Sequence, residues 1–125
     1  MPQLIEHTEV LDMKILLVDD DKTVVESLDI ILSTVDEFDI VGYGYNGEDA
    51  IDYCNNNQVD IVLMDIQMPG LDGICACRTI KKNHPDIKII MLTTFHDYKS
   101  INQSLQAGAS GYLLKSDETN KQITT

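Results

Sequence analysis

The sequence predicts an α/β protein, a doubly wound five-stranded parallel sheet with helices on both faces. Short apolar runs rich in Ile, Val and Leu alternate with longer amphipathic stretches, which is typical of a parallel sheet covered on both sides. The content of 43% hydrophobic and 24% charged residues excludes a disordered or low-complexity chain. A length of 125 residues suffices for one domain with a hydrophobic core and leaves little room for a second.

The strands are expected at five apolar runs that are too short to be helices. In chain order they are Lys14–Val18, Phe38–Tyr43, Asp60–Met64, Lys88–Leu92 and Gly111–Leu114. Strands joined by helical crossovers run parallel, and such crossovers are right-handed, which gives a doubly wound sheet.

Amphipathic stretches between these runs predict the helices. The first is expected over Thr23–Val35, where apolar residues recur at helical spacing and Thr23 with Glu26 can form a capping box. The others are expected over Asn46–Asn56 with Asn46 as the cap, Gly73–Asn83, and Asp97–Ala107.

Both ends of the chain carry an expectation about domain boundaries. We expect residues 13–125 to form the domain, and residues 1–12 to be a flexible tail or the remnant of a tag. A fifth helix is expected to begin near Thr119, and it has room for barely two turns before Thr125. The domain is therefore expected to be truncated in its last helix.

The charge balance is strongly acidic. Nine Lys and Arg residues stand against 21 Asp and Glu residues, which gives a net charge of -12. Such a charge repels nucleic-acid phosphates and anionic membrane surfaces. We therefore expect the domain itself to bind neither DNA nor a membrane.

The cysteines point to a structural role in a reducing compartment. Cys54, Cys75 and Cys77 show neither CxxC nor the Cys/His spacing of a zinc site, and we expect buried roles as small side chains. No apolar run approaches the roughly 18 residues that a membrane span needs, and the N-terminal residues lack a signal-peptide core. A cytoplasmic location is expected.

Polar residues follow four of the five predicted strands. Asp19, Asp20 and Asp21 follow the first strand, Asp65 the third, Thr93 and Thr94 the fourth, and Lys115 the fifth. The carboxyl ends of parallel strands meet at one edge of a sheet, so we expect these side chains to converge. Clustered carboxylates favour a cation, and Mg²⁺ (or Mn²⁺) suits an oxygen-rich site completed by phosphate. A nucleophilic carboxylate, a metal site, a hydroxyl and an ammonium together favour phosphoryl transfer.

Each of these residues also has an ordinary interpretation. Asp20 and Asp21 can cap the next helix, and Asp65 can start a turn. Thr93 and Lys115 can be a strand-end and a surface residue. Their joint placement at successive strand ends favours a functional site over four unrelated roles.

Four motifs resemble the receiver domain of bacterial two-component response regulators. They are Val18–Asp21 (VDDD), Met64–Gly73 (MDIQMPGLDG), Met91–Phe95 (MLTTF) and Gly108–Lys115 (GASGYLLK). The motifs occur in the family's order and at its spacing, and the resemblance runs from about Met13 to the end. It implies a flavodoxin-like sheet with strand order 2-1-3-4-5.

The resemblance implies a phosphoacceptor and a metal site. Asp65 would accept the phosphoryl group. Asp20 would be a direct Mg²⁺ ligand, Asp19 would act largely through water, and the backbone carbonyl of Gln67 would be a further ligand.

The resemblance also implies a switch. Thr93 and Lys115 would contact the phosphoryl group, and the ring of Tyr112 would turn inward as Thr93 moves toward the phosphate. Gln67 and Phe95 would flank the path of the hydrolytic water and so modulate the lifetime of the phosphorylated state. Bulky Phe95 offers that water no hydrogen bond, and slow dephosphorylation is expected.

The Thr-Thr-Phe string within Met91–Phe95 and the motif Gly108–Lys115 look most like the subfamily with a C-terminal LuxR/NarL-type helix-turn-helix output domain. This subfamily implies a sensor histidine kinase as phosphoryl donor, a homodimer on activation, and transcription control through a DNA-binding domain missing from this chain. The domain would be a signalling switch rather than a classical enzyme. It would catalyse its own aspartyl phosphorylation and a slow dephosphorylation.

Two alternatives remain open at this point. Asp19–Thr23 (DDDKT) also spells the Asp-x-Asp-x-Thr loop of haloacid-dehalogenase-type phosphatases, with Asp19 as nucleophile and Asp21 as general acid/base. That interpretation leaves the string from Asp65 to Gly73 unexplained. The second alternative is an interaction module that is never phosphorylated, although its usual sign, a missing residue at the strand ends, is not seen.

Overall fold

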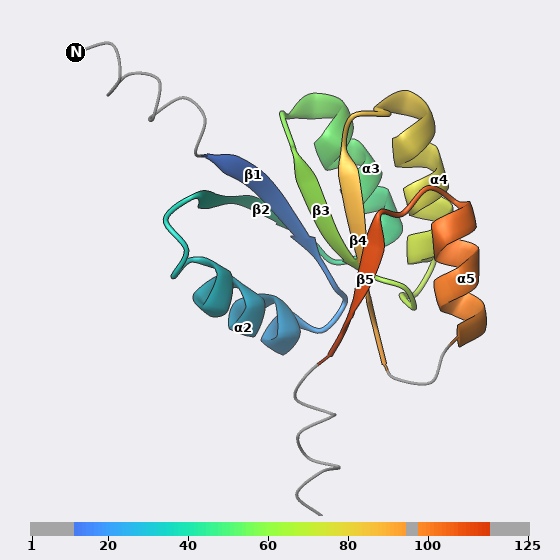
Figure 1. Ribbon diagram of the computed structural model, residues 1–125, viewed down its shortest axis with the longest axis horizontal. Coiled ribbons are helices and arrows are strands. Elements are labelled where there is room, and N and C mark those ends of the chain that lie inside the picture. Colours follow the sequence, from blue (N-terminus) through green and yellow to red (C-terminus); the bar gives the residue numbers. More distant parts are fainter. Residues whose placement is uncertain (1–11, 95–97, 116–125) are drawn as a thin grey trace, which may run out of the picture.

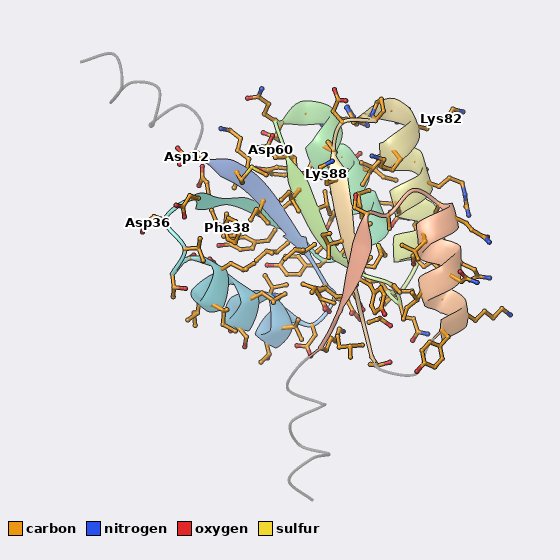
Figure 2. All side chains as sticks on the ribbon, in the orientation of Figure 1. Asp12, Asp36, Phe38, Asp60, Lys82 and Lys88 are labelled. Carbon is orange, nitrogen blue, oxygen red and sulfur yellow. The ribbon has the colours of Figure 1, made fainter. Side chains whose placement is uncertain are left out.

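The computed structural model describes residues 12–94 and 98–115. Its strands form one parallel sheet in the order β2-β1-β3-β4-β5, which confirms the predicted fold class and strand order. The strands are β1 (Met13–Val18), β2 (Phe38–Gly44), β3 (Ile61–Asp65), β4 (Lys88–Thr93) and β5 (Gly111–Leu114). Asp60 and Lys88 mark the amino ends of β3 and β4 (Figure 2).

Helices cover both faces of the sheet. Within the described residues they are α2 (Lys22–Leu32), α3 (Gly47–Asn56), α4 (Gly73–Asn83) and α5 (Tyr98–Gln106). Figure 1 shows α2 on one face and α3, α4 and α5 on the other. This arrangement leaves the carboxyl ends of the strands and the loops that follow them at one edge of the molecule.

The central strands are buried on both faces because successive residues, which point to opposite faces of the sheet, are apolar. In β1, Leu16 and Val18 point into the cluster beneath α3 and α4, whereas Ile15 and Leu17 point into the cluster beneath α2. A continuous apolar run is the pattern of such a two-sided strand.

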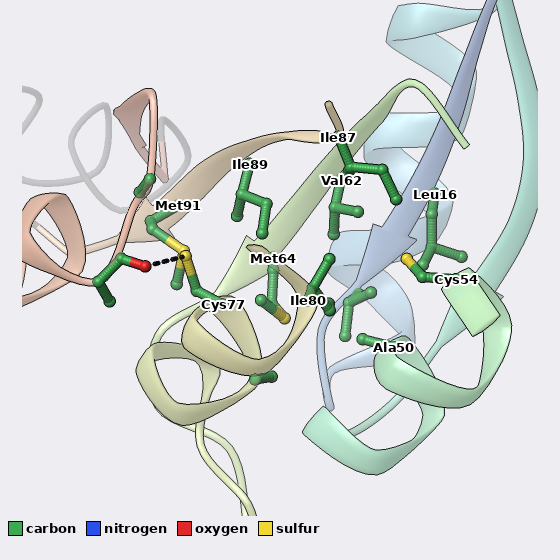
Figure 3. Close-up of a cluster of buried hydrophobic side chains, with 14 of the residues drawn as sticks. Leu16, Ala50, Cys54, Val62, Met64, Cys77, Ile80, Ile87, Ile89 and Met91 are labelled. Atoms are coloured by element: carbon green, nitrogen blue, oxygen red, sulfur yellow. Dashed lines mark hydrogen bonds between the residues drawn. The ribbon is translucent and has the colours of Figure 1, made fainter. Parts of the chain in front are cut away.

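The larger cluster joins the sheet to α3 and α4 (Figure 3). Its buried members include Leu16, Val62, Met64, Ile89 and Met91 from the strands and Ala50, Cys54, Cys77 and Ile80 from the helices. This core fixes β1, β3 and β4 relative to one another, so the loops at their carboxyl ends start from a rigid base.

The buried thiols of Cys54 and Cys77 belong to this core and are unreactive. Burial raises the pKa of Cys54 and that of Cys77 to about 11, so neither is a thiolate at neutral pH. The thiol of Cys77 also donates a long 3.8 Å hydrogen bond to the carbonyl of Ala107 (Figure 3). Cys54 and Cys77 therefore act as small core side chains, as expected from the sequence, whereas Cys75 is only partly buried.

The first predicted helix differs from the observed one at both ends. Asp21, not Thr23, is the N-cap, because its carboxylate accepts the Thr23 N–H at 2.9 Å. The helix ends at Leu32 rather than Val35. The Thr34 hydroxyl donates to the Ile31 carbonyl at 2.7 Å, and such side-chain bonds compete with continued helix.

The remaining boundaries agree with the sequence prediction to within a residue wherever the structure describes them. The expected helix start at Asp97, the expected fifth helix near Thr119 and most of the N-terminal extension lie outside the described residues. None of the described helices has the length and the apolar character required to cross a membrane.

Candidate functional site

The strand register brings the predicted polar residues together at the carboxyl edge of the sheet. Pairs in the register are Val18 with Met64, Asp65 with Leu92, and Thr93 with Leu114. The residues that follow these positions line an open pocket of about 290 Å³. Its lining consists of Asp19, Asp20, Asp21, Asp65, Ile66, Gln67, Thr93, Thr94 and Lys115.

Two buried aspartates face one lysine in this pocket. Asp19 is 0% exposed and Asp65 is 6% exposed. The ammonium of Lys115 lies 3.2 Å from Asp19 Oδ2 and 3.2 Å from Asp65 Oδ1. One positive charge thus faces two carboxylates at the bottom of the pocket, which leaves excess negative charge in a poorly solvated place.

The proton affinities reflect this excess. Burial, with a further contribution from the charge of Asp19, raises the pKa of Asp65 to about 6, and Lys115 opposes the rise. Burial also raises the pKa of Asp19, against the Asp21 N–H and Lys115. Burial alone would lower the pKa of Lys115, but Asp65 and Asp19 outweigh it and the pKa is raised. The two carboxylates therefore need more positive charge than Lys115 supplies.

The donor set suits a hard divalent cation. Carboxylate oxygens of Asp19, Asp20 and Asp65 lie within 4.8 Å of one another. Asp19 Oδ2 is buried and forms an ion pair with Lys115 at 3.2 Å, and among the described residues no further side chain or backbone group satisfies it. Asp20 is exposed at the rim, where a cation can keep several water ligands. Charge, oxygen donors and partial solvation all fit Mg²⁺ better than a soft metal.

Asp21 lies at the pocket but its carboxylate serves the backbone. Its side chain caps α2, and its N–H donates to Asp19 Oδ1 at 2.9 Å. The turn after β1 therefore orients Asp19 into the pocket. The ordinary interpretation of Asp21 as a helix cap is thus confirmed, although the residue also lines the pocket.

The loop after β3 presents Gln67 beside Asp65. It is closed at its base, because the Gly73 N–H donates to the Ile66 carbonyl at 2.8 Å and the Ile66 N–H donates to the Leu92 carbonyl at 3.1 Å. A Cβ at Gly73 would lie 2.1 Å from the carbonyl oxygen of Asp65. Glycine therefore permits α4 to start directly against the strand end.

The residues expected to form the switch lie on β4 and β5. Thr93 is buried, and its hydroxyl donates to the Thr94 carbonyl at 3.0 Å. Tyr112 is exposed on β5, where it pairs with Met91 in the register. Gln67 lines the pocket, whereas Phe95 lies outside the described residues. The roles of Gln67 and Phe95 in lifetime stay predictions.

One structural part of the site escaped the sequence prediction. The strand ending at Gly44 supplies no side chain to the pocket, yet its carbonyl accepts the Asp19 N–H at 3.1 Å. Ile66, which lines the pocket, is a second part that the sequence does not predict. A signal was present in the two glycines, Gly44 and Gly47, because close glycines at a strand-to-helix turn often mark close backbone approach.

The family model described as response regulator receiver domain matches residues 15–124. The response regulator UvrY of Escherichia coli (strain K12) is 43% identical over 103 residues, which are 82% of this chain and 47% of UvrY. The transcriptional regulatory protein LnrK of Bacillus subtilis (strain 168) is 41% identical over the same shares. The chain thus spans about half the length of these curated relatives.

A solved structure shows the same architecture. It is a two-component response regulator of the LuxR family from Aurantimonas sp. SI85-9A1, with a TM-score of 0.80 and 30% sequence identity. The similarity covers 84% of this chain and 75% of that one. These matches agree with the motif resemblance, including the LuxR/NarL-type subfamily, and do not support the phosphatase alternative.

Proposed function

The chain belongs to the family of response regulator receiver domains, and we propose that Asp65 accepts the phosphoryl group that operates it as a switch. One observation carries this assignment. Asp65 is buried next to a second carboxylate, and its pKa is raised to about 6, while an ammonium lies 3.2 Å from Oδ1. A structural aspartate gains nothing from such surroundings, whereas a nucleophile that receives an anionic group needs the nearby cation.

The reaction forms one bond to phosphorus and breaks another. A carboxylate oxygen of Asp65 attacks the phosphorus of a phosphohistidine, a P–O bond forms, and the P–N bond to the imidazole breaks. The electron pair of that bond goes to the imidazole nitrogen, which takes a proton from solvent. A sensor histidine kinase is the proposed donor, in line with the response-regulator names of the relatives.

A divalent cation would be held by the carboxylates of Asp19, Asp20 and Asp65 and by the backbone carbonyl of Gln67. Bound there, Mg²⁺ supplies positive charge to the phosphoryl oxygens and to the crowded carboxylates. Asp21 contributes by orienting Asp19 through its N–H, not as a ligand of its own.

Lys115 and Thr93 would then hold the transferred group. Lys115 already lies beside Asp65 Oδ1 and can pair with a phosphoryl oxygen. The Thr93 hydroxyl donates to the Thr94 carbonyl, so reaching the phosphoryl group requires it to leave this partner. We propose that this movement frees the space into which Tyr112 turns, changing the face formed by α5 and β5.

The proposed output follows from the relatives rather than from the site. We propose that the changed face promotes a homodimer and controls transcription through a DNA-binding domain that lies outside this chain. The acidic net charge of -12 fits this division of labour, because contact with DNA phosphates would belong to another domain.

Phosphorylation of the purified chain by acetyl phosphate tests the assignment of Asp65. With Mg²⁺, the wild-type chain should take up phosphate stoichiometrically on an acid-stable, hydroxylamine-sensitive acyl linkage, and Asp65→Asn should take up none. Asp60→Asn, at the other end of β3, is the matched control and should behave like the wild type. Stoichiometric labelling of Asp65→Asn at another residue would refute the assignment, and a label on Asp19 with steady turnover of a phosphomonoester would favour the phosphatase alternative.

A further inference from the structure

The turn from β2 to α3 contacts the loop after β1 and the loop after β3, although its side chains do not line the pocket. At its start, the carbonyl of Gly44 accepts the Asp19 N–H at 3.1 Å. At its end, the N–H of Gly47 donates to the Leu71 carbonyl at 3.2 Å. Leu71 belongs to the loop after β3 that also carries Gln67. The turn therefore links the loop that presents Asp19 to the loop that presents Gln67.

Gly47 is the point of closest approach in this link. A Cβ at Gly47 would lie 2.4 Å from the carbonyl oxygen of Leu71 and 3.2 Å from its Cβ. The nearest atom is backbone, so the loop itself would have to move to admit a side chain. Gly47 is also the first residue of α3, and its N–H is one of the donors that a helix leaves unpaired at its start. The Leu71 carbonyl satisfies that donor.

The turn is rigid enough to set the position of the loop. Asn46 Oδ1 accepts the Asp49 N–H at 2.7 Å, and Asp49 Oδ2 accepts the Tyr45 N–H at 3.0 Å. These two bonds lock the start of α3 on both sides of Gly47, in the manner of a capping box. Leu71 in turn packs against the core beneath α3 and α4.

We propose that Gly47 is a positioning residue for the divalent cation. Its close contact with Leu71 sets the place of the loop after β3, and with it the carbonyl of Gln67 relative to Asp19 and Asp65. The inference rests on the proposed function, because it concerns the same cation site. It assigns part of the cation affinity to a turn that holds no ligand.

The test is a Mg²⁺ titration of the 125-residue chain by calorimetry, with no phosphoryl donor present. Gly47→Ala should raise the dissociation constant for Mg²⁺ about tenfold, the lower end of the range seen when groups that support metal ligands are changed. At saturating Mg²⁺, its phosphorylation by acetyl phosphate should return to within about twofold of the wild-type rate, because the reacting groups themselves are intact. Wild-type Mg²⁺ affinity in a folded Gly47→Ala chain would overturn the inference.

Gly42→Ala is the matched control. Its Cβ would lie 2.6 Å from the ring of Tyr53, so this variant also strains the unit formed by β2 and α3, but against a side chain of α3 rather than against the backbone of the loop after β3. It should bind Mg²⁺ like the wild type even where its melting temperature falls. Equal losses of Mg²⁺ affinity in both variants would show a general loss of stability and overturn the assignment of Gly47.

A second measurement covers the case in which Gly47→Ala does not fold. Coupling between two sites is reciprocal, so Mg²⁺ must stabilise the contact between Gly47 and Leu71 if that contact supports Mg²⁺ binding. Hydrogen exchange of the Gly47 amide in the wild-type chain should therefore slow about tenfold at saturating Mg²⁺. An unchanged exchange rate would overturn the inference.

The outcomes separate this inference from the proposed function. A wild-type chain that is phosphorylated on Asp65, with Gly47→Ala binding Mg²⁺ normally, overturns the inference alone. A chain in which Gly47→Ala weakens Mg²⁺ binding, but whose wild type takes up no phosphate on Asp65, overturns the proposed function alone.

Discussion

An aspartate directly precedes strand β3 and another ends it, and the two have opposite surroundings. Asp60 lies at the amino end (Figure 2) and is exposed. Its Oδ2 accepts the Lys14 N–H at 2.8 Å. Asp65, at the carboxyl end, is buried beside Asp19, with Lys115 as the shared cation. One carboxylate completes the backbone hydrogen bonding of a sheet. The other lowers the stability of the resting protein unless more positive charge arrives.

This difference shows how one fold separates stability from function along a single strand. The amino end carries Asp60, whose partner is a backbone N–H group, so its removal costs a hydrogen bond. The carboxyl end carries charges whose balance depends on a ligand. Removing the charge of Asp65 and removing that of Asp60 should therefore change the free energy of unfolding with opposite signs.

The largest effect is expected from removing the shared cation. Lys115→Met leaves Asp19 and Asp65 buried without an opposite charge, and should lower the free energy of unfolding by on the order of 2–4 kcal/mol in EDTA at pH 7.5. Because Mg²⁺ supplies charge to the same carboxylates, it should restore a large part of this loss. Urea unfolding with EDTA and with Mg²⁺ measures both values.

Lys88→Met is the control for this change, since Lys88 is exposed at the amino end of β4. Its effect should stay within about 0.5 kcal/mol and should not depend on Mg²⁺. If Lys115→Met were as stable as Lys88→Met in EDTA, the idea that Lys115 holds two buried charges would be wrong.

The next effect should be a gain in stability. Asp65→Asn removes the buried negative charge and should raise the free energy of unfolding of the metal-free chain by on the order of 1–3 kcal/mol at pH 7.5. Asp60→Ala should instead lower it by about 1 kcal/mol, because the Lys14 N–H loses its partner. Equal signs for the two variants would contradict the proposed difference between the ends of β3.

Protonation of Asp65 makes the free energy of unfolding depend on pH. The pKa of Asp65 is raised from 3.8 to about 6 in the folded chain, so between these pH values the folded state binds more protons than the unfolded state. The contribution of Asp65 to the free energy of unfolding must then fall as pH rises from about 4 to about 6. Urea unfolding of the wild type in EDTA across this window should show this fall, and Asp65→Asn should show a smaller one.

The sequence was sufficient for the architecture because apolar runs such as those of β1 and β3 are too short for helices and lack polar alternation, which favours strands of a sheet covered on both faces. It was also sufficient to bring Asp19, Asp65 and Lys115 to one edge, since parallel strands end together. It did not predict the contact between Gly47 and Leu71. Such a contact joins backbone atoms of two distant loops. The glycine at Gly47 is compatible with a close backbone approach, but it does not identify Leu71 as the partner.

The cap of α2 shows a second limit. Thr23 with Glu26 and Asp21 are both acceptable capping patterns, and periodicity places a helix start only to within a residue or two. The turn after β1 decides between them. The Asp21 N–H donates to the Asp19 carboxylate, and the Asp21 carboxylate accepts the Thr23 N–H.

Substitution of Asp21 should have the smallest effect on the free energy of unfolding, and it tests the comparison between Asp60 and Asp65. It lies at the carboxyl end of the sheet, yet it resembles Asp60, since it is exposed and accepts a backbone N–H. Asp21→Ser preserves a good N-cap and should change the free energy of unfolding by no more than about 0.5 kcal/mol, whereas Asp21→Ala should lower it by about 1 kcal/mol. Denaturation of both variants against the wild type measures the cap.

Phosphorylation separates the cap from a catalytic role for Asp21. If Asp21 only caps α2 and orients Asp19 through its N–H, then Asp21→Ser should be phosphorylated by acetyl phosphate at a rate within about twofold of the wild type, because the backbone donor remains. A general acid/base, as the phosphatase alternative requires, would cost about 10²-fold or more when replaced. A loss of that size in Asp21→Ser, with stability unchanged, would show that the Asp21 carboxylate takes part in the reaction, as proposed for Asp65, and does not only accept a backbone N–H, as Asp60 does.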